Sequence, residues 1–156
     1  MLSLSRKSDY ALLALAEMAR GDDCSVSVRM LADRLSVPPR MMTNILNSLT
    51  HRGLVKSCRG SQGGYSLARS PQEITVLALL EAIEGPAQLA LCCCESEPAE
   101  SDQCRIKDVC EIKAPIRKIH EGICELLGQV TVHDITFNRV NLNVGAAVAM
   151  IKGKAN

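Results

Sequence analysis

The chain has 156 residues, 47% of them hydrophobic, and its aromatic side chains are one Phe and two Tyr. This length allows one domain, or a small domain with a dimerising extension, built around an aliphatic core. Neither an apolar run of about 18 residues, as a membrane span needs, nor the pattern of a secretory signal occurs. Composition therefore argues against a membrane protein and predicts a cytoplasmic one.

Charge is unevenly distributed along the chain, although the net charge is only +1. Residues 1–70 contain ten Lys or Arg and five Asp or Glu, whereas residues 71–156 contain eight and twelve. A basic first half suits an anionic partner such as the DNA backbone.

Three helical patterns come first in the chain. Residues 10–20 carry an apolar stripe at helical spacing, with Ser8 as the predicted cap. Residues 27–35 begin with a hydroxyl cap at Ser27 and stop at a Ser-Val-Pro-Pro segment. Residues 40–51 form the next amphipathic helix, and the short turn between these last two predicts a helix-turn-helix.

A hairpin follows directly. Gly53 is predicted to close the preceding helix, residues 54–58 and 65–67 have the pattern of strands, and residues 59–64 form a glycine-rich loop between them. A hairpin after a helix-turn-helix is a wing. The predicted fold class is therefore mainly α with a small β wing, a winged helix-turn-helix domain plus a long dimerisation helix.

The second half is predicted to extend this domain. Residues 74–84 form a helix capped by Thr75, and residues 91–113 are mostly loop. From Pro115 onward, apolar residues recur at alternating spacings of three and four, which is typical of a helix that pairs with another long helix, here that of a second subunit. This predicted dimerisation seam consists of Ile116, Ile119, Ile123, Leu126 and Val130.

Four regions result. Residues 1–85 are the winged domain, 86–113 the cysteine-bearing segment, 114–137 the dimerisation helix with a short helix, and 138–156 a tail without assigned structure. The chemistry of a helix-turn-helix predicts base contacts from the start of its second helix, and phosphate or minor-groove contacts from the wing. The predicted DNA-binding residues are Arg40, Met41, Thr43, Asn44 and Asn47 on the helix, and Lys56, Arg59 and Ser61 on the wing.

Cysteines are concentrated in one segment. Of eight in the chain, five fall within nineteen consecutive residues, namely Cys92, Cys93, Cys94, Cys104 and Cys110. In a reducing compartment such a cluster indicates metal binding or redox chemistry. An iron-sulfur cluster, a structural zinc site of Cys92, Cys94, Cys104 and Cys110, and a thiol switch without metal are all compatible with it. Isolated Cys24, Cys58 and Cys124 are interpreted as packing residues.

Three segments together resemble a bacterial family of iron-sulfur winged helix-turn-helix regulators that includes IscR, NsrR and RirA. They are Leu-Ser-Arg-Lys-Ser-Asp-Tyr-Ala-Leu at 4–12, Arg-Gly-Ser-Gln-Gly-Gly-Tyr-Ser-Leu at 59–67, and the Cys104–Cys110 spacing before a long helix. The resemblance covers about residues 2–137. It implies a homodimer that binds double-stranded DNA and whose cluster responds to iron supply, nitric oxide or redox stress.

The same resemblance implies a set of metal ligands. Three loop cysteines bind the cluster in that family, and Cys104 and Cys110 match the last two. Cys94 is the preferred first ligand, with Cys92 next and Cys93 also adjacent. Lys113 stands where IscR-like members have histidine, whereas Asp9 matches an acidic residue that reaches the partner's cluster in NsrR-like members. Whether the cluster has two or four irons stays open.

Catalysis is not predicted, because no nucleophile with a positioned base and no phosphate-binding glycine loop before a helix is present. A redox enzyme, a cluster carrier and a protein-interaction adaptor are the competing classes. Salt-dependent DNA binding discriminates the regulator from all three.

Overall fold

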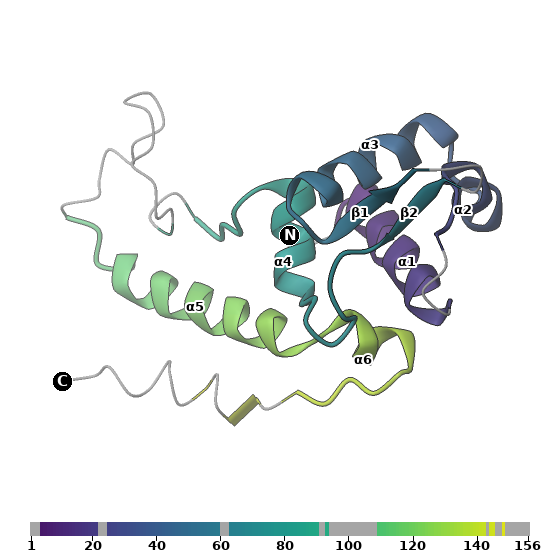
Figure 1. Cartoon of the computed structure of the whole chain (residues 1–156). Helices are drawn as coiled ribbons and strands as arrows, with labels where there is room; N and C mark the ends of the chain where they lie inside the picture. Colours follow the sequence, from purple (N-terminus) through teal and green to yellow (C-terminus); the bar gives the residue numbers. More distant parts are fainter. Residues whose placement is uncertain are drawn as a thin grey trace.

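The computed structural model describes residues 4–21, 25–59, 63–90, 93, 109–142, 144–145 and 148. Figure 1 shows a body of short helices with a two-stranded hairpin, from which one long helix extends. The elements in chain order are α1 (Arg6–Arg20), α2 (Val28–Leu35), α3 (Pro39–His51), β1 (Val55–Cys58), β2 (Gly64–Leu67), α4 (Val76–Glu84), α5 (Lys113–Gln129) and α6 (Val132–Thr136). The predicted fold class, mainly helical with a small β wing, is confirmed.

Hydroxyl caps define the helix starts. The Ser27 side chain accepts a hydrogen bond from the Met30 backbone N–H at 3.1 Å and caps α2, as its sequence predicts. Thr75 caps α4 in the same way. For α1 the predicted cap was wrong: Ser5, not Ser8, is the N-cap, so the helix starts at Arg6 instead of Tyr10. Ser8 lies inside the helix and is fully buried.

The turn of the helix-turn-helix is short because Ser36 adopts a left-handed conformation, with φ of 53°. Its backbone and that of Val37 return hydrogen bonds to the last turn of α2. Pro39 then starts α3 at a position where a missing N–H costs nothing. Gly53, with φ of 68°, ends α3 as predicted and leads into the wing.

The wing is a hairpin of β1 and β2 paired antiparallel, with Ser57 opposite Tyr65. A third segment joins it, because Val26 and Tyr65 exchange backbone hydrogen bonds of 2.8 and 2.9 Å. This pairing requires a glycine next to Tyr65: a Cβ atom on Gly64 would lie 2.6 Å from the Val26 carbonyl oxygen. The wing is thus fastened to the start of the helix-turn-helix.

An aliphatic core fills the space between the first four helices and the wing, as composition predicts. Its fully buried side chains come from α1, α2, α3, β1, the segment before α4, α4 and, through Val132, α6. Burial of each such side chain stabilises the fold by roughly 1.5–3 kcal/mol. They include Leu15, Leu31, Met42, Ile45, Leu46, Leu49, Val55, Ile74 and Leu79.

Backbone hydrogen bonds join the C-terminal end of α5 to the winged body. The Val76 N–H donates to the Val130 carbonyl, and the Val132 N–H donates to the Ile74 carbonyl, both at 2.8 Å. Helix α6 then packs on α1. Although the sequence groups α6 with the predicted dimerisation helix, α6 lies against the winged body.

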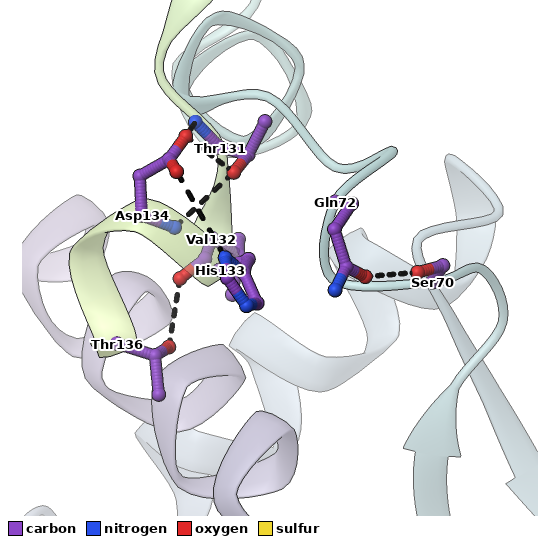
Figure 2. Close-up of polar contacts among 7 residues, drawn as sticks. All are labelled: Ser70, Gln72, Thr131, Val132, His133, Asp134 and Thr136. Atoms are coloured by element: carbon purple, nitrogen blue, oxygen red, sulfur yellow. Dashed lines mark hydrogen bonds and ion pairs between the residues drawn. The ribbon is translucent and has the colours of Figure 1, made fainter. Parts of the chain in front are cut away.

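Figure 2 shows the capping box that starts α6. The Asp134 N–H donates to the Thr131 hydroxyl, and the Asp134 carboxylate accepts from the Thr131 N–H at 2.9 Å and from its hydroxyl at 2.6 Å. The hydroxyl bond first, then the backbone bond, lower the pKa of Asp134 below its ordinary value. The box fixes the direction in which α5 leaves the body.

No helix in the part of the chain that the structure describes combines the length and the apolarity needed to cross a lipid bilayer.

Candidate nucleic-acid interface

Helix α3 has two opposite faces. Arg40, Asn44 and Asn47 are exposed along one face at spacings of four and three residues. The residues that pack into the core, Met42, Ile45, Leu46 and Leu49, lie on the other. The helix therefore presents a continuous polar stripe to solvent while its apolar side holds it in place.

Two of the predicted base-reading residues, Met41 and Thr43, are less available for contacts than the residues of this stripe. Met41 is partly buried and packs against the core, so little of its side chain is available to a ligand. The Thr43 hydroxyl donates to the Pro39 carbonyl at 2.9 Å. Its proton is therefore engaged within the helix, while the methyl group and the oxygen lone pairs are left for contacts.

The wing carries two exposed cations. Lys56 and Arg59 are exposed, and neither they nor Arg40 form an ion pair with any residue that the structure describes. Exposed cations without an ion-pair partner are suited to phosphate groups. Ser61, the remaining predicted wing contact, lies outside the described residues.

One residue at this surface was not predicted. Tyr65 of β2 is partly buried, and its hydroxyl donates to Oδ1 of Asn47 on α3 at 3.4 Å. The aromatic residue stands out in a chain with only two tyrosines. Its contact joins the wing to the polar stripe.

A second unpredicted contact joins the start of α1 to the C-terminal end of α4. The Ser5 and Ser8 hydroxyls both donate to Oε1 of Glu84, the Ser8 bond at 2.7 Å. These bonds, with that of Ser5 the larger effect, lower the pKa of Glu84 below its ordinary value. The start of α1 is thereby tied to the point from which the chain leaves the body toward the cysteines.

Of the predicted cluster ligands, Cys93, Cys110 and Asp9 are described, whereas Cys92, Cys94 and Cys104 lie outside the described residues. Cys110 is partly exposed and lies three residues before α5 begins. Asp9 is exposed in the first turn of α1. Within the described part of the chain, no three His, Cys, Asp or Glu side chains form a group that could hold a metal ion.

Cys93 has a different environment from Cys110. It is 6% exposed and lines a groove of about 1240 Å³ between α4 and α5. Cys124 of α5 lines the same groove, with its sulfur 3.8 and 3.7 Å from the two ring nitrogens of His120. The Cys124 sulfur is thus in contact with the His120 ring, one turn earlier in α5.

The predicted dimerisation seam lies mostly on the face of α5 that turns away from this groove. A period of 3.6 residues per turn, about 100° per residue, places Ile119 and Leu126 about opposite Cys124. Ile119 is 41% exposed, and Ile116, Ile123 and Leu126 are partly exposed. Val130, in contrast, is 9% exposed at the C-cap, where its carbonyl pairs with α4. An apolar stripe on α5 thus remains open to solvent.

Residues 4–138 match the family described as Rrf2, iron-dependent transcriptional regulator. The chain belongs to the Rrf2 family. Its winged helix, polar α3 stripe and wing cations are thus those of an Rrf2-family transcriptional regulator, and the predicted resemblance to the IscR and NsrR regulators is confirmed.

Rrf2-family relatives match over most of the chain. An rrf2-like HTH-type transcriptional regulator of Rhodobacter capsulatus is 29% identical over 136 residues, which cover 85% of this chain and 91% of that protein. NsrR of Shouchella clausii is 25% identical over 142 residues, 90% of this chain and 93% of the relative.

Two solved structures share the fold. IscR of T. potens superposes with a TM-score of 0.64 and 26% identity over 89% of each chain. CymR, described as the global cysteine regulator of B. subtilis, superposes with a TM-score of 0.65 and 25% identity, over 90% of this chain and 100% of CymR.

Proposed function

We propose that this Rrf2-family protein binds specific DNA sequences as a homodimer and senses iron, redox state or nitric oxide through an iron-sulfur cluster held by cysteines of the 92–110 segment. The observation that carries the DNA-binding part is the exposed α3 stripe of Arg40, Asn44 and Asn47 beside the unpaired wing cations. Arg reads guanine and Asn reads adenine in the major groove, so these are side chains suited to sequence recognition.

The wing complements this helix. Lys56 is placed to meet a phosphate, and Arg59, before the glycine-rich loop, is placed to enter a narrow minor groove. Ser61 is proposed as a further phosphate contact. Together with Thr43, and with Met41 at most at the margin, these residues make up the proposed DNA-binding surface.

Dimerisation through α5 follows from its open apolar stripe. Ile116, Ile119, Ile123 and Leu126 on each of two copies would bury one another as knobs into holes. A two-fold axis there would present two copies of α3 to half-sites about 34 Å apart, one turn of DNA. Because Val130 is already buried within its own chain, we place it at the edge of this interface.

The donor chemistry fits an iron-sulfur cluster. Thiolates are the ligands that such clusters take, and Cys110 lies three residues before the start of α5. Asp9 is exposed, and its carboxylate forms no ion pair or side-chain hydrogen bond with described residues. Cys94, Cys104 and Cys110 are proposed as ligands with Cys92 as the substitute, and Asp9 as the fourth, from the partner subunit. Burial in the α4–α5 groove makes Cys93 the weakest candidate.

When bound, a cluster would link the cysteines of one subunit to the start of α1 in the partner subunit, through Asp9 of the partner subunit. The consequence for the chain follows from how α5 is held. Its C-terminal end is hydrogen-bonded to α4, whereas its N-terminal end lies about 25 Å away for 17 residues, three residues after Cys110. A cluster that binds Cys110 and Asp9 of the partner subunit would fix the angle of α5 and hence the spacing of the two α3 helices.

The decisive experiment compares DNA binding by anaerobically purified and cluster-free protein at one salt concentration. Selection from a random duplex library should yield a palindromic motif, with an affinity that falls steeply as salt rises. The two forms should differ in affinity or in motif. Equal affinity and equal preference would contradict sensing, and the absence of any motif would contradict sequence-specific binding.

Cluster binding has its own test. Protein carrying Cys110→Ala should lose the visible absorption, the iron and the sulfide of the anaerobic sample, whereas the control Cys58→Ala, in the wing, should retain them. A colourless wild-type protein with stoichiometric zinc would instead support the alternative of a structural zinc site at Cys92, Cys94, Cys104 and Cys110. A colourless, metal-free protein would support a thiol switch.

A further inference from the structure

We propose that Tyr65 of the wing is a specificity-determining residue, because its hydroxyl holds the Asn47 side chain in the orientation that offers an amide N–H, not a carbonyl oxygen, to the DNA bases. This inference rests on the proposed sequence-specific DNA binding. It goes beyond it by assigning which base edge Asn47 prefers.

Tyr65 is held in place through both its backbone and its ring. Its backbone is hydrogen-bonded to Val26 by two bonds, and Ser57 of β1 lies opposite on the other side. The ring is partly buried and packs against the core. Gly64 permits this close pairing, since any side chain there would meet the Val26 carbonyl. The hydroxyl therefore has a fixed position relative to α3.

Asn47 is fixed in the helix by its backbone, and its side chain is oriented by one contact from the wing. It lies in the interior of α3, and its side chain is exposed on the polar stripe between Asn44 and His51. The Tyr65 hydroxyl donates a hydrogen bond to Asn47 Oδ1 at 3.4 Å. Because the carbonyl oxygen turns toward the wing, the NH₂ group turns away from it, along the stripe.

Hydrogen-bond chemistry then predicts a base preference. An unrestrained asparagine pairs with adenine through two bonds, accepting from N6 and donating to N7. An asparagine whose oxygen is turned toward the wing presents its two N–H donors to the groove, and these match the adjacent N7 and O6 acceptors of guanine. Cytosine presents only a donor in the major groove and should be disfavoured.

The test uses the full-length protein and two matched variants. Tyr65→Phe removes one oxygen and keeps the ring, while the control Tyr10→Phe removes the same oxygen from the other tyrosine, on α1. Motifs are selected from a random duplex library for wild type and Asn47→Ala, and the base pair at which Asn47→Ala loses its base preference is taken as the one that Asn47 reads. Affinities are then measured for duplexes that differ only at this base pair.

Wild-type protein and Tyr10→Phe should prefer guanine there. Tyr65→Phe should shift the guanine-to-adenine affinity ratio toward adenine by about three- to tenfold, the value of one hydrogen bond. The double variant Tyr65→Phe/Asn47→Ala should behave as Asn47→Ala alone, because Tyr65 acts through Asn47.

Several results would overturn the inference. The first is that Tyr65→Phe and wild type have the same base preference. The second is that Tyr65→Phe changes the base preference only at a base pair that Asn47→Ala does not affect. The third is that wild type prefers adenine at the base pair that Asn47 reads. If the wild-type protein selects no motif at all, the proposed function itself fails and the inference with it, which separates the two failures.

Discussion

Replacing Gly64 by alanine should loosen the attachment of the wing to the helix-turn-helix. The added Cβ atom would lie 2.6 Å from the carbonyl oxygen of Val26, 2.8 Å from its carbonyl carbon and 3.2 Å from the backbone nitrogen of Ser27. All three are backbone atoms, which cannot move aside as the end of a flexible side chain does. Strand β2 or the segment before α2 must therefore shift.

The magnitude follows from the bonds at risk. The shift would strain or break the two backbone hydrogen bonds between Val26 and Tyr65. At about 0.5–1.5 kcal/mol each, their loss lowers the free energy of unfolding by about 1–3 kcal/mol. For a chain of this length each kcal/mol corresponds to a melting temperature lower by about 2–4 °C.

Thermal and urea unfolding, followed by circular dichroism, measure this directly. Gly21→Ala is the matched control, since its Cβ atom would meet only the Met18 carbonyl oxygen, at an ordinary 3.6 Å. DNA affinity should also fall in Gly64→Ala, because the wing loses its fixed position beside α3. If Gly64→Ala and Gly21→Ala unfold at the same temperature and bind DNA equally, the reasoning from backbone approach is refuted.

Three further outcomes are expected. Leu46→Ala, at a fully buried position of α3, should lower the free energy of unfolding in urea by about 2–5 kcal/mol; a loss under 1 kcal/mol would contradict the assigned core. Lys56→Ala should reduce the slope of log affinity against log salt by about 0.9, the loss of one phosphate contact, and an unchanged slope would remove Lys56 from the interface. Because the Thr131 bonds lower the pKa of Asp134 in the folded chain, its carboxylate stabilises the fold fully above the unfolded pKa, and this contribution is lost as pH falls through the folded pKa. Melting temperatures between pH 3 and pH 7 should therefore depend less on pH in Asp134→Asn than in wild type, and parallel profiles would exclude this role.

Local sequence was sufficient for the elements of the winged domain. Ser27 and Thr75 cap their helices through hydroxyls that reach only three residues ahead, and the turn after α3 needs only a glycine that accepts a positive φ. Periodicity also separated the buried face of α3 from the stripe of Arg40, Asn44 and Asn47. Such features can be predicted because the interacting groups are a few residues apart in the chain.

Other features depend on groups that are distant in sequence. Ser8 was the predicted cap of α1, yet Ser5 takes that place, and both hydroxyls also bind Glu84, more than seventy residues away. The hydroxyl of Tyr65 meets Asn47 only because the wing folds back against α3.

The winged helix, its polar stripe and the apolar seam of α5 can be predicted from the chain alone, since each depends on periodicity, caps and turns. Three features emerge only on folding: Val130 is buried at the joint with α4, Cys93 lines the α4–α5 groove, and the Tyr65 hydroxyl meets Asn47. The difference lies in the range of the interactions. Helices and turns are specified by neighbouring residues, whereas burial and side-chain partners are fixed only when separate elements pack together.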